Sequence, residues 1–183
     1  MAKFKNPCSH KDSPWYNEEK ERWYDNASFE VNDSVKERKK TWDSFTNERI
    51  SKIYPDIQQS AINFINQVES ELGIRLRVYS GKRTWDEQDA LYEQGRTLPG
   101  KIITNAKGGY SYHNYGLAID VVEIRNKEAI WDTNWLGIGK IGIENGFEWG
   151  GNFESFIDKP HFQMTLGYSI SDLLKLHKAG KWY

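Results

Sequence analysis

The sequence predicts an α+β domain, in which helices and separate strands follow one another along the chain. Apolar residues from Ile57 to Leu72 recur at the helical period, and Gly73 follows as a stop signal. Ile74–Tyr79 alternates apolar and polar residues, as half-exposed strands do, and Leu117–Ile124 is an apolar run typical of a buried strand. The 183 residues suffice for one domain, and 14% aromatic residues can supply its core.

The remaining elements are expected from caps and periodicity. They are a helix from the Thr84/Glu87 capping box to Gly95, a helix at Trp135–Glu144, a strand at His161–Leu166 and a helix at Ser169–Lys178. Residues 96–112 contain Pro99 and three glycines and are expected to form a long loop. A loop of that length in a compact domain is often functional.

Charge divides the chain into two parts. Residues 1–48 hold 9 basic and 10 acidic side chains, whereas the 135 residues that follow hold 16 of each. We therefore expect an N-terminal extension of unknown role at 1–48 and the folded domain at 49–183. Because the extension also carries several aromatic residues, it should pack either on its own domain, the interpretation we favour, or on an external partner.

Composition and charge exclude several classes of protein. The net charge of -1 lacks the basic excess of nucleic-acid-binding proteins, so no nucleic acid partner is expected. No apolar run approaches the roughly 20 residues of a membrane span. The first 16 residues lack the apolar stretch of a signal peptide, which predicts synthesis in the cytoplasm. The single cysteine, Cys8, excludes an internal disulfide. We expect a monomer.

Two of the four histidines lie where a loop meets a strand. His113 precedes the apolar run Leu117–Val122, and His161 begins a later strand. Asp120 lies inside the apolar run, where a carboxylate needs a compensating positive charge. A metal ion supplies that charge, and two histidines with one carboxylate are a frequent ligand set for catalytic zinc that leaves one position open. These residues therefore predict a metal site.

Two more residues suit hydrolysis at such a site. Asp158 lies three residues before His161 and could act as a general base, because zinc lowers the pKa of a bound water to about 7. Arg83 could stabilise the oxyanion that forms on an attacked carbonyl.

Each of these residues also has a purely structural interpretation, and spacing alone does not choose between them. Local hydrogen bonds could satisfy both histidines, and Asp120 could form a buried salt bridge with Arg83. Asp158 could be a turn residue before Pro160. Together, however, these interpretations must account for an acid in an apolar strand as well as for both histidines.

Residues 49 to 167 resemble the family of zinc D-Ala-D-Ala carboxypeptidases and L-alanyl-D-glutamate endopeptidases. The signature S-x-H-x-x-G-x-A-x-D is matched at every specified position from Ser111 to Asp120. A second signature, an acid two residues before Pro-His-Phe, is matched by Asp158–Phe162. Further similar segments are Ser80–Thr84 with Gln88, Tyr92–Thr97, Thr104–Ala106 and Phe147–Gly151. The Gln-Gly-Arg-Thr and Thr-Asn-Ala stretches resemble the endopeptidase branch in particular.

The resemblance implies a Hedgehog/DD-peptidase fold, a small antiparallel sheet flanked by helices, with a specific role for each matching residue. The implied roles are zinc ligands for His113, Asp120 and His161, catalytic groups for Asp158 and Arg83, and substrate contacts for Ser111, Gln88, Tyr115 and Trp149. The family often carries an aromatic residue where this chain has Lys82, which leaves the substrate contacts beside Arg83 open.

The predicted function is hydrolysis of the peptide stems of bacterial peptidoglycan by one Zn2+ ion. An L-alanyl-D-glutamate endopeptidase is favoured, with a D,D- or L,D-carboxypeptidase as the alternative, because Arg83 and Arg96 could each bind a terminal carboxylate. A non-catalytic zinc-containing module of the Hedgehog type is the alternative from another class, but Asp158 argues against it. The enzyme would reach the wall by holin-type release or through a secretion machine, and in the second case it would need an immunity protein.

Overall fold

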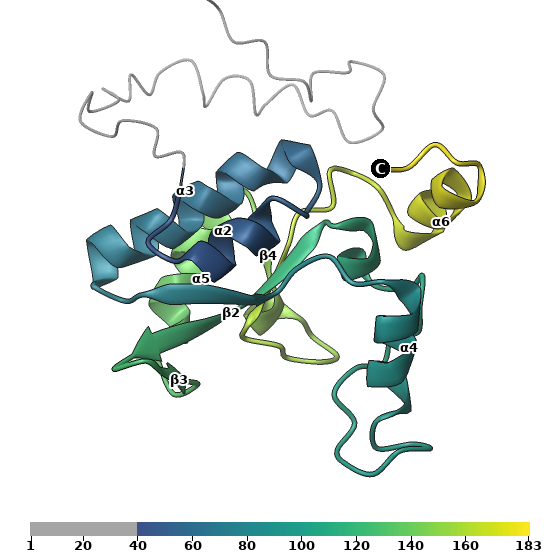
Figure 1. The fold of residues 1–183 in the computed structure, drawn as a ribbon, viewed down its shortest axis with the longest axis horizontal. Coiled ribbons are helices and arrows are strands. Elements are labelled where there is room, and N and C mark those ends of the chain that lie inside the picture. The colour runs from purple at the N-terminus through teal and green to yellow at the C-terminus, as the bar shows by residue number, and fades with distance from the viewer. Residues whose placement is uncertain (1–39) are drawn as a thin grey trace, which may run out of the picture. The chain divides into compact units, whose positions relative to one another are not determined.

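The computed structural model describes residues 40–183, in which helices pack around one antiparallel sheet (Figure 1). The strands are β1 (Leu76–Ser80), β2 (Ala118–Arg125), β3 (Glu128–Ile130), β4 (Glu148–Trp149) and β5 (His161–Gln163). The helices are α2 (Ser44–Ile50), α3 (Pro55–Leu72), α4 (Trp85–Glu93), α5 (Trp135–Glu144) and α6 (Ile170–Lys178), with 3-10 turns η1 (Tyr112–Tyr115) and η2 (Gly150–Asn152). No helix in this part of the chain is long and apolar enough to span a membrane.

Strand β2 is the centre of the sheet. One of its edges pairs with β1, and the other pairs first with β5 and then with β3, while β4 lies beyond β5. Every one of these pairs is antiparallel. A mixture of helices with an antiparallel sheet confirms the α+β class that the sequence predicts.

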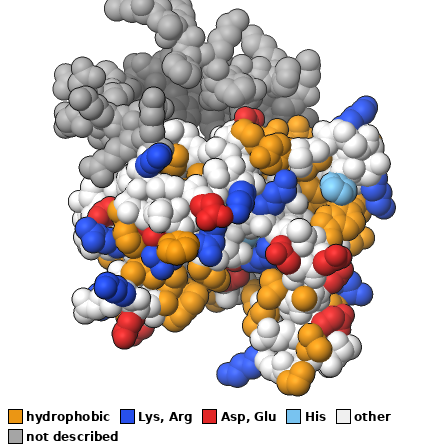
Figure 2. Space-filling view, in the orientation of Figure 1, with side chains coloured by type: hydrophobic (Ala, Val, Ile, Leu, Met, Phe, Trp, Pro, Cys, Tyr) orange, Lys and Arg blue, Asp and Glu red, His pale blue; other side chains and the backbone are white. Residues whose placement is uncertain are grey.

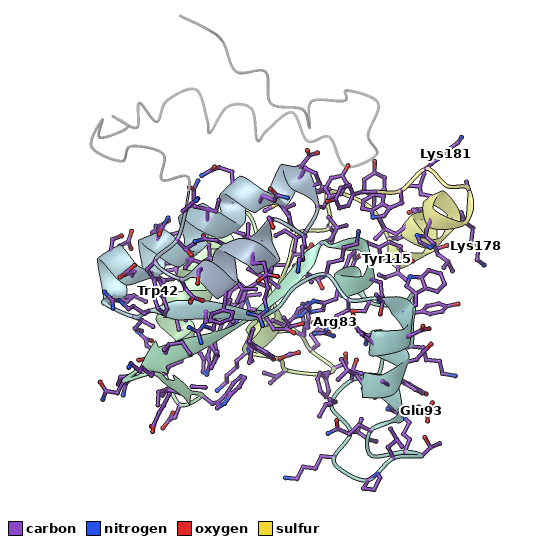
Figure 3. The ribbon with its side chains drawn as sticks, in the orientation of Figure 1. Trp42, Arg83, Glu93, Tyr115, Lys178 and Lys181 are labelled. Carbon is purple, nitrogen blue, oxygen red and sulfur yellow. The ribbon has the colours of Figure 1, made fainter. Side chains whose placement is uncertain are left out.

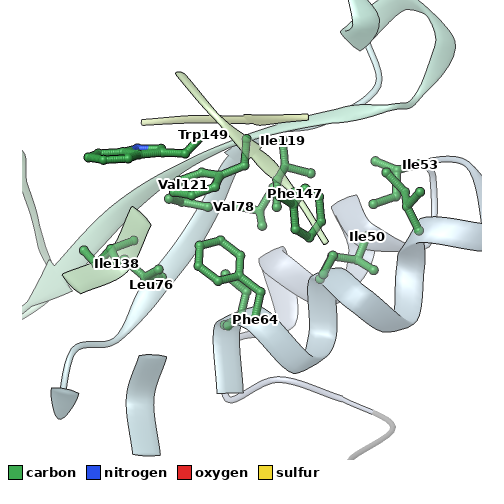
Figure 4. Close-up of a cluster of buried hydrophobic side chains, with 14 of the residues drawn as sticks. Ile50, Ile53, Phe64, Leu76, Val78, Ile119, Val121, Ile138, Phe147 and Trp149 are labelled. Atoms are coloured by element: carbon green, nitrogen blue, oxygen red, sulfur yellow. The ribbon is translucent and has the colours of Figure 1, made fainter. Parts of the chain in front are cut away.

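The core lies between the sheet and helices α3 and α5. Phe64 of α3 packs against Phe162 of β5 with ring centroids 4.6 Å apart, and Phe147 completes this aromatic group at 5.8 Å from Phe64. All three side chains are buried, and Figure 4 shows Phe64 and Phe147 among the aliphatic side chains of β1 and β2. Burying each Phe stabilises the fold by roughly 2–3 kcal/mol. This core fixes the sheet on which the candidate site is built.

The helix starts agree with the signals of the sequence. Helix α3 begins at Pro55 and ends at Leu72, followed by the C-cap Gly73, whose φ of 68° allows the left-handed conformation. The capping box at the start of α4 joins Thr84 and Glu87, and Ser169 caps α6 in the same way. All four predicted helix starts are confirmed, including that of α5 at Trp135, whereas α4 ends at Glu93 and not at the expected Gly95.

The shorter elements differ from the sequence prediction. The predicted strand from His161 ends at Gln163, because Leu166 takes a positive φ of 51° and breaks the extended backbone. The hairpin strand β3 is not predicted. It follows a turn in which Asn126 and Lys127 both have positive φ, and Lys is not a residue that signals such a turn.

Residues 40–48 belong to the same compact unit as the rest of the described chain. Trp42 donates from Nε1 to the Leu76 carbonyl at 3.0 Å, and Arg77 donates twice to Asp43 at 2.9 Å. The boundary expected at residue 48 therefore falls inside α2, which packs on β1. The rest of the expected extension, residues 1–39, lies outside the described residues.

Candidate metal centre and cleft

The register of the sheet brings two of the predicted ligands together. Asp120 on β2 lies directly opposite His161 on β5, so their side chains share one face of the sheet. His161 Nδ1 lies 3.0 Å from Asp120 Oδ1. Forty-one residues separate them in the sequence, and the antiparallel pairing closes this distance.

The third predicted ligand reaches the same point from η1. Ser111 caps this turn by accepting a hydrogen bond from the His113 amide, and Gly116 ends it in the left-handed conformation with φ of 70°. Tyr54 donates its amide to the Gly116 carbonyl at 2.8 Å, and a Cβ at Gly116 would lie 2.9 Å from that same amide nitrogen. Glycine is therefore required here by both backbone angle and space.

Three ligand atoms converge from these positions. His113 Nε2 lies 3.2 Å from Asp120 Oδ1 and 3.2 Å from His161 Nδ1. The side chain of His113 is 3% exposed, that of Asp120 is 6% exposed and that of His161 is 12% exposed. Bulk water therefore has little access to the three ligand atoms and cannot readily form hydrogen bonds with them. Ligands about 2.0–2.1 Å from a tetrahedral zinc ion are about 3.4 Å apart, which is close to the spacing seen here.

The outer hydrogen bonds determine which nitrogen of each ring carries a proton. His113 Nδ1 lies 2.8 Å from the Gly81 carbonyl and must donate to it, which leaves Nε2 as a lone pair. Gln163 uses its Nε2 to donate to Glu148 at 2.8 Å, so its Oε1 accepts from His161 Nε2 at 3.0 Å. His161 Nδ1 is then a lone pair as well.

These assignments place two lone pairs and one carboxylate oxygen against one another with no hydrogen-bond donor among them. A divalent cation satisfies all three atoms, and the donor set of two imidazoles and one carboxylate suits zinc. The residues therefore fit the metal that the sequence predicts. The outer partners, the Gly81 carbonyl and Gln163, have the geometry of groups that orient metal-bound histidines.

The electrostatics of the cluster favour a positive charge at its centre. Burial alone would raise the pKa of Asp120, but its interactions with His113 and His161 outweigh burial and hold that pKa well below its usual value. Burial lowers the pKa of His113, which keeps that ring neutral. Burial also disfavours the charged form of His161, yet the neighbouring Asp120 raises the pKa of that ring, because a protonated Nδ1 can donate to the carboxylate. The lone-pair assignment above therefore holds for the neutral ring, and the charge of Asp120 favours a positive charge beside it, which either a proton or a metal ion supplies.

Arg83 is held in place by three side chains. It donates to Asp120 Oδ2 at 2.5 Å, to Gln88 Oε1 at 2.9 Å and to Ser80 Oγ at 2.9 Å. Figure 3 shows it between the sheet and α4. Asp120 uses Oδ2 for the salt bridge with Arg83 and Oδ1 for its contacts with the two histidines. The salt bridge therefore leaves the candidate ligand atom of Asp120 available.

Asp158 lies in the loop after η2 and lines the same cleft as the three ligands. Its amide donates to the Gly150 carbonyl at 3.0 Å, and its carbonyl accepts from the His161 amide at 3.1 Å. A Cβ at Gly150 would lie 2.4 Å from the Asp158 carbonyl oxygen, so only glycine allows this close approach. Burial and the charge of Asp120 raise the pKa of Asp158, which suits a group that takes up and releases a proton.

The cluster opens into a cleft of about 870 Å3. One wall is the loop before η1, where Ile102, Ile103 and Tyr110 are 49%, 42% and 56% exposed. The opposite wall is the loop after η2, where Phe156 and Ile157 are 43% and 65% exposed. Exposed apolar walls around a few convergent polar groups are typical of a ligand site.

The predicted substrate contacts divide into two groups. Ser111 lines the cleft. Tyr115 is fully buried and its hydroxyl donates to the Gly109 carbonyl at 2.8 Å, and Trp149 is 7% exposed and donates to the Lys159 carbonyl at 2.8 Å. Gln88 is fully buried between Arg83 and the Ala106 carbonyl. These three side chains are buried and do not line the cleft in this structure, so their predicted contacts with substrate stay predictions.

Two residues that the sequence reasoning missed support the site. Gln163 sets the tautomer of His161, and Ser80 holds the Arg83 Nε atom. Gln163 lies two residues after His161 on the same strand, and such a spacing places both side chains on one face. That periodicity could have indicated Gln163, whereas nothing in the sequence indicates the role of Ser80.

Comparison with known proteins agrees with this site. A family profile described as D-alanyl-D-alanine carboxypeptidase matches residues 104–164, which contain all three candidate ligands. The chain is 40% identical over 125 residues to the peptidoglycan L-alanyl-D-glutamate endopeptidase CwlK of Bacillus subtilis (strain 168), covering 62% of this chain and 74% of that one.

Two further proteins are more distantly similar. The L-alanyl-D-glutamate peptidase of Listeria phage A118 is 29% identical over 120 residues, covering 63% of this chain and 39% of that one. The crystal structure of the Serratia marcescens L-Ala D-Glu endopeptidase ChiX is 22% identical with a TM-score of 0.49, covering 73% of this chain and 95% of that one.

The buried His-Asp-His cluster at the base of an open cleft is a candidate metal centre, and together with the profile match and the Bacillus relative it places the chain among the metallopeptidases. With the profile match and the Bacillus relative, the chain belongs to the M15 peptidase family, which includes D-alanyl-D-alanine carboxypeptidases and peptidoglycan endopeptidases.

Proposed function

We propose that the protein is a zinc-dependent peptidase that hydrolyses the bond between L-alanine and D-glutamate in peptidoglycan stem peptides. The observation that carries this proposal is the convergence of His113, Asp120 and His161 beneath a cleft that Asp158 and Arg83 also line. The endopeptidase name of the Bacillus relative, at 40% identity, supports the choice of bond.

His113 Nε2, Asp120 Oδ1 and His161 Nδ1 would hold the ion. Bound zinc polarises a carbonyl and lowers the pKa of water. The outer hydrogen bonds that the two rings donate to the Gly81 carbonyl and to Gln163 Oε1 keep both lone pairs aimed at one point, so the ligands need no reorganisation on binding.

Asp158 is the proposed general base and acid. Its carboxylate takes a proton from the attacking water and returns one to the departing amine nitrogen of D-glutamate. Its raised pKa makes the carboxylate a stronger base, which favours the first of these two transfers. The backbone bonds to Gly150 and His161 fix its position beside the ligands.

Arg83 is the proposed stabiliser of the developing oxyanion. Three of its five N–H groups are used by Asp120, Gln88 and Ser80, so two remain to face the cleft. The ion pair with Asp120 also holds the guanidinium rigid, and a preorganised donor is worth more than a mobile one. Ser111 lines the same part of the cleft and can donate to the substrate carbonyl.

One of the two arginines that could bind a terminal carboxylate is fully engaged, which favours the endopeptidase over the carboxypeptidase. Arg96 donates to the carbonyls of Tyr92 and Thr104 and to Asn105 Oδ1, and its guanidinium stacks 3.8 Å from the Tyr92 ring. A bidentate clamp by Arg96 on a free chain end would require breaking this set of hydrogen bonds. Arg83 keeps two N–H groups for the substrate, and we assign these to the oxyanion.

The test is mass spectrometry of the products formed from purified peptidoglycan by the zinc-loaded protein, with and without a chelator. We expect stem fragments with a new N-terminal D-glutamate or D-isoglutamine, and no products when chelator is present. Release of a single terminal D-alanine would identify a carboxypeptidase instead. No cleavage of any wall type would contradict the proposal and favour a binding module.

For delivery, we propose that the protein reaches the wall by lysin-type release. The similarity to a phage peptidase supports this route over delivery by a secretion machine, and it requires no immunity protein. The peptidoglycan stem is then its partner, and we propose that the protein acts on it as a monomer.

A further inference from the structure

A second cavity, of about 490 Å3, adjoins the candidate active-site cleft. The two share four lining residues, Tyr79, Ser80, Arg83 and Leu91. The remaining lining of the second cavity comes from α2 and its following turn, from the segment around Lys82 and from α4. A substrate bound across Arg83 would therefore have one group in this second cavity.

The lining of this cavity is predominantly basic. It contains Arg49, Lys52, Lys82 and Arg83, with Glu87 as its one acidic side chain. Glu87 already accepts the Thr84 amide at 2.8 Å in the capping box of α4. In Figure 2, Lys and Arg side chains lie near the middle of the face, between the positions that α2 and α4 occupy in Figure 1. The cavity thus offers positive charge to a ligand.

Two of the four cations form no ion pair with a described residue, although the charge of Arg49 acts on the neighbouring Glu48, which itself pairs with Lys52. Lys52 pairs with Glu48, and Arg83 pairs with Asp120. Arg49 and Lys82 form no ion pair within residues 40–183. These two residues are free to bind an anion.

Arg49 is half-buried in the last turn of α2. The helix dipole favours a cation at that end but does not neutralise it, and within the described chain its guanidinium makes no hydrogen bond. A half-buried guanidinium without a partner carries a desolvation cost that a bound carboxylate would offset.

Lys82 is exposed, and its Nζ lies 4.3 Å from the centre of the Tyr183 ring. This cation–π contact orients the ammonium group and leaves its charge uncompensated.

We propose that Arg49 and Lys82 form a subsite for the carboxylate next to the scissile bond, an inference that rests on the proposed function. D-glutamate continues the stem through its γ-carboxyl group, so its α-carboxyl group remains on the carbon that bears the scissile nitrogen. In some walls this group is a free carboxylate and in others it is an amide. Because only two covalent bonds separate it from the scissile nitrogen, it must lie beside Arg83, where the basic cavity begins. The subsite would select stems with the free carboxylate.

The experiment compares two synthetic tripeptides, acetyl-L-Ala-γ-D-Glu-L-Lys and its α-amide, with the zinc-loaded full chain. We expect kcat/KM to be about tenfold higher for the free acid, as two partly exposed charged hydrogen bonds would give. Lys82→Met and Arg49→Gln should each lower this ratio, and the double variant should bring it close to one. Salt should lower the ratio for the unmodified protein but not for the double variant.

The matched control is Arg75→Gln, which removes one positive charge from a residue that pairs with Glu69 and lines neither cavity. Arg75→Gln should keep the same kcat/KM ratio of free acid to α-amide as the unmodified protein. Equal kcat/KM for the two peptides in the unmodified protein, or a ratio that survives in the double variant, would overturn the subsite. Because Lys82 is exposed, Lys82→Met remains informative if Arg49→Gln fails to fold.

Calorimetric binding of the same two peptides to the Asp158→Ala protein separates this inference from the proposed function. Tighter binding of the free acid supports the subsite even if neither peptide is hydrolysed, in which case only the proposed reaction would be wrong. Equal affinities would overturn the subsite even if both peptides are hydrolysed.

Discussion

The floor and the walls of the cleft are built in different ways. The three ligand residues on the floor lie on β2, β5 and η1, and their side chains are at most 12% exposed. The wall residues Ile103 and Ile157 lie on loops and are 42% and 65% exposed. Strand pairing and the capped turn η1 position the floor. The first wall is held by side-chain hydrogen bonds from Arg96, and the second is closed by the backbone bond between Asp158 and Gly150. We therefore expect changes on the floor to act on metal binding and chemistry, and changes in the walls to act on substrate binding.

The floor should be the most sensitive region. His161→Ala removes one of the three ligand atoms and should abolish metal binding and lower kcat/KM by more than about a thousandfold, as should a chelator. Elemental analysis and peptidoglycan hydrolysis measure both effects. His177→Ala is the matched control, because this histidine lies on α6 against Trp85, and it should retain metal. Activity in chelator-treated protein would contradict the metal assignment.

Asp158 lies between the floor and the second wall, and its substitution tests the chemical step separately from metal binding. Asp158→Ala should keep the metal, because none of the three ligand atoms is lost, but should lower kcat by about 10²- to 10⁴-fold. Single-turnover kinetics on a stem peptide would measure the loss. Glu154→Ala removes an exposed acid from the same loop and should leave the rate near that of the unmodified protein. A near-normal rate for Asp158→Ala would show that another group is the base.

Substitutions that loosen the first wall, the loop before η1, should change KM more than kcat. Arg96→Gln removes donors to the Thr104 carbonyl and Asn105 Oδ1, so the loop that lines the cleft should loosen. We expect KM to rise roughly three- to tenfold with a smaller change in kcat. Arg96→Lys keeps the positive charge but loses the planar set of N–H donors, so its KM should lie between those of the unmodified protein and Arg96→Gln. A fall in kcat at constant KM would instead assign Arg96 to the chemical step.

The smallest expected effect concerns the attachment of α2 to the sheet. Burial would raise the pKa of Asp43, but hydrogen bonds from Arg77 and Thr46 outweigh it and lower that pKa below its ordinary value of 3.8. A carboxylate whose pKa is lowered by folding stabilises the fold above its unfolded pKa, and this contribution is lost as the pH falls below about 4. Asp43→Asn should therefore cost about 1–2 kcal/mol at pH 7 and flatten the acid limb of the stability curve.

Chemical denaturation between pH 2 and pH 7 measures this contribution. Glu48→Gln is the control, because it breaks the exposed pair with Lys52 and should change stability little. An unchanged acid limb in Asp43→Asn would show that the pair with Arg77 contributes nothing.

The sequence alone predicts those features that depend on neighbouring residues in the chain. A carboxylate in an apolar strand indicated Asp120, and capping boxes located α4 and α6. The sequence alone does not predict which side chains are buried by contacts between distant segments. Tyr115 lies inside the ligand motif between His113 and Gly116, yet its side chain is buried in the core, and Gln88 supports Arg83 from a fully buried position. The proton positions on His113 and His161 depend on Gly81 and Gln163, which come from other segments of the chain.

The close contact between Gly150 and Asp158 joins the two ends of the loop that carries Phe156 and Ile157. A loop whose ends meet is a small Ω-like unit, and changes between its ends need not reach the strands that flank it. We therefore expect that residues 154–157 can be shortened, extended or exchanged while Asp158 and His161 stay where they are, whereas Phe153 is needed because its ring centroid lies 5.9 Å from that of His161. Natural variation of this segment, or grafting of a foreign loop onto it, would change which wall peptides are accepted without rebuilding the hydrolytic machinery.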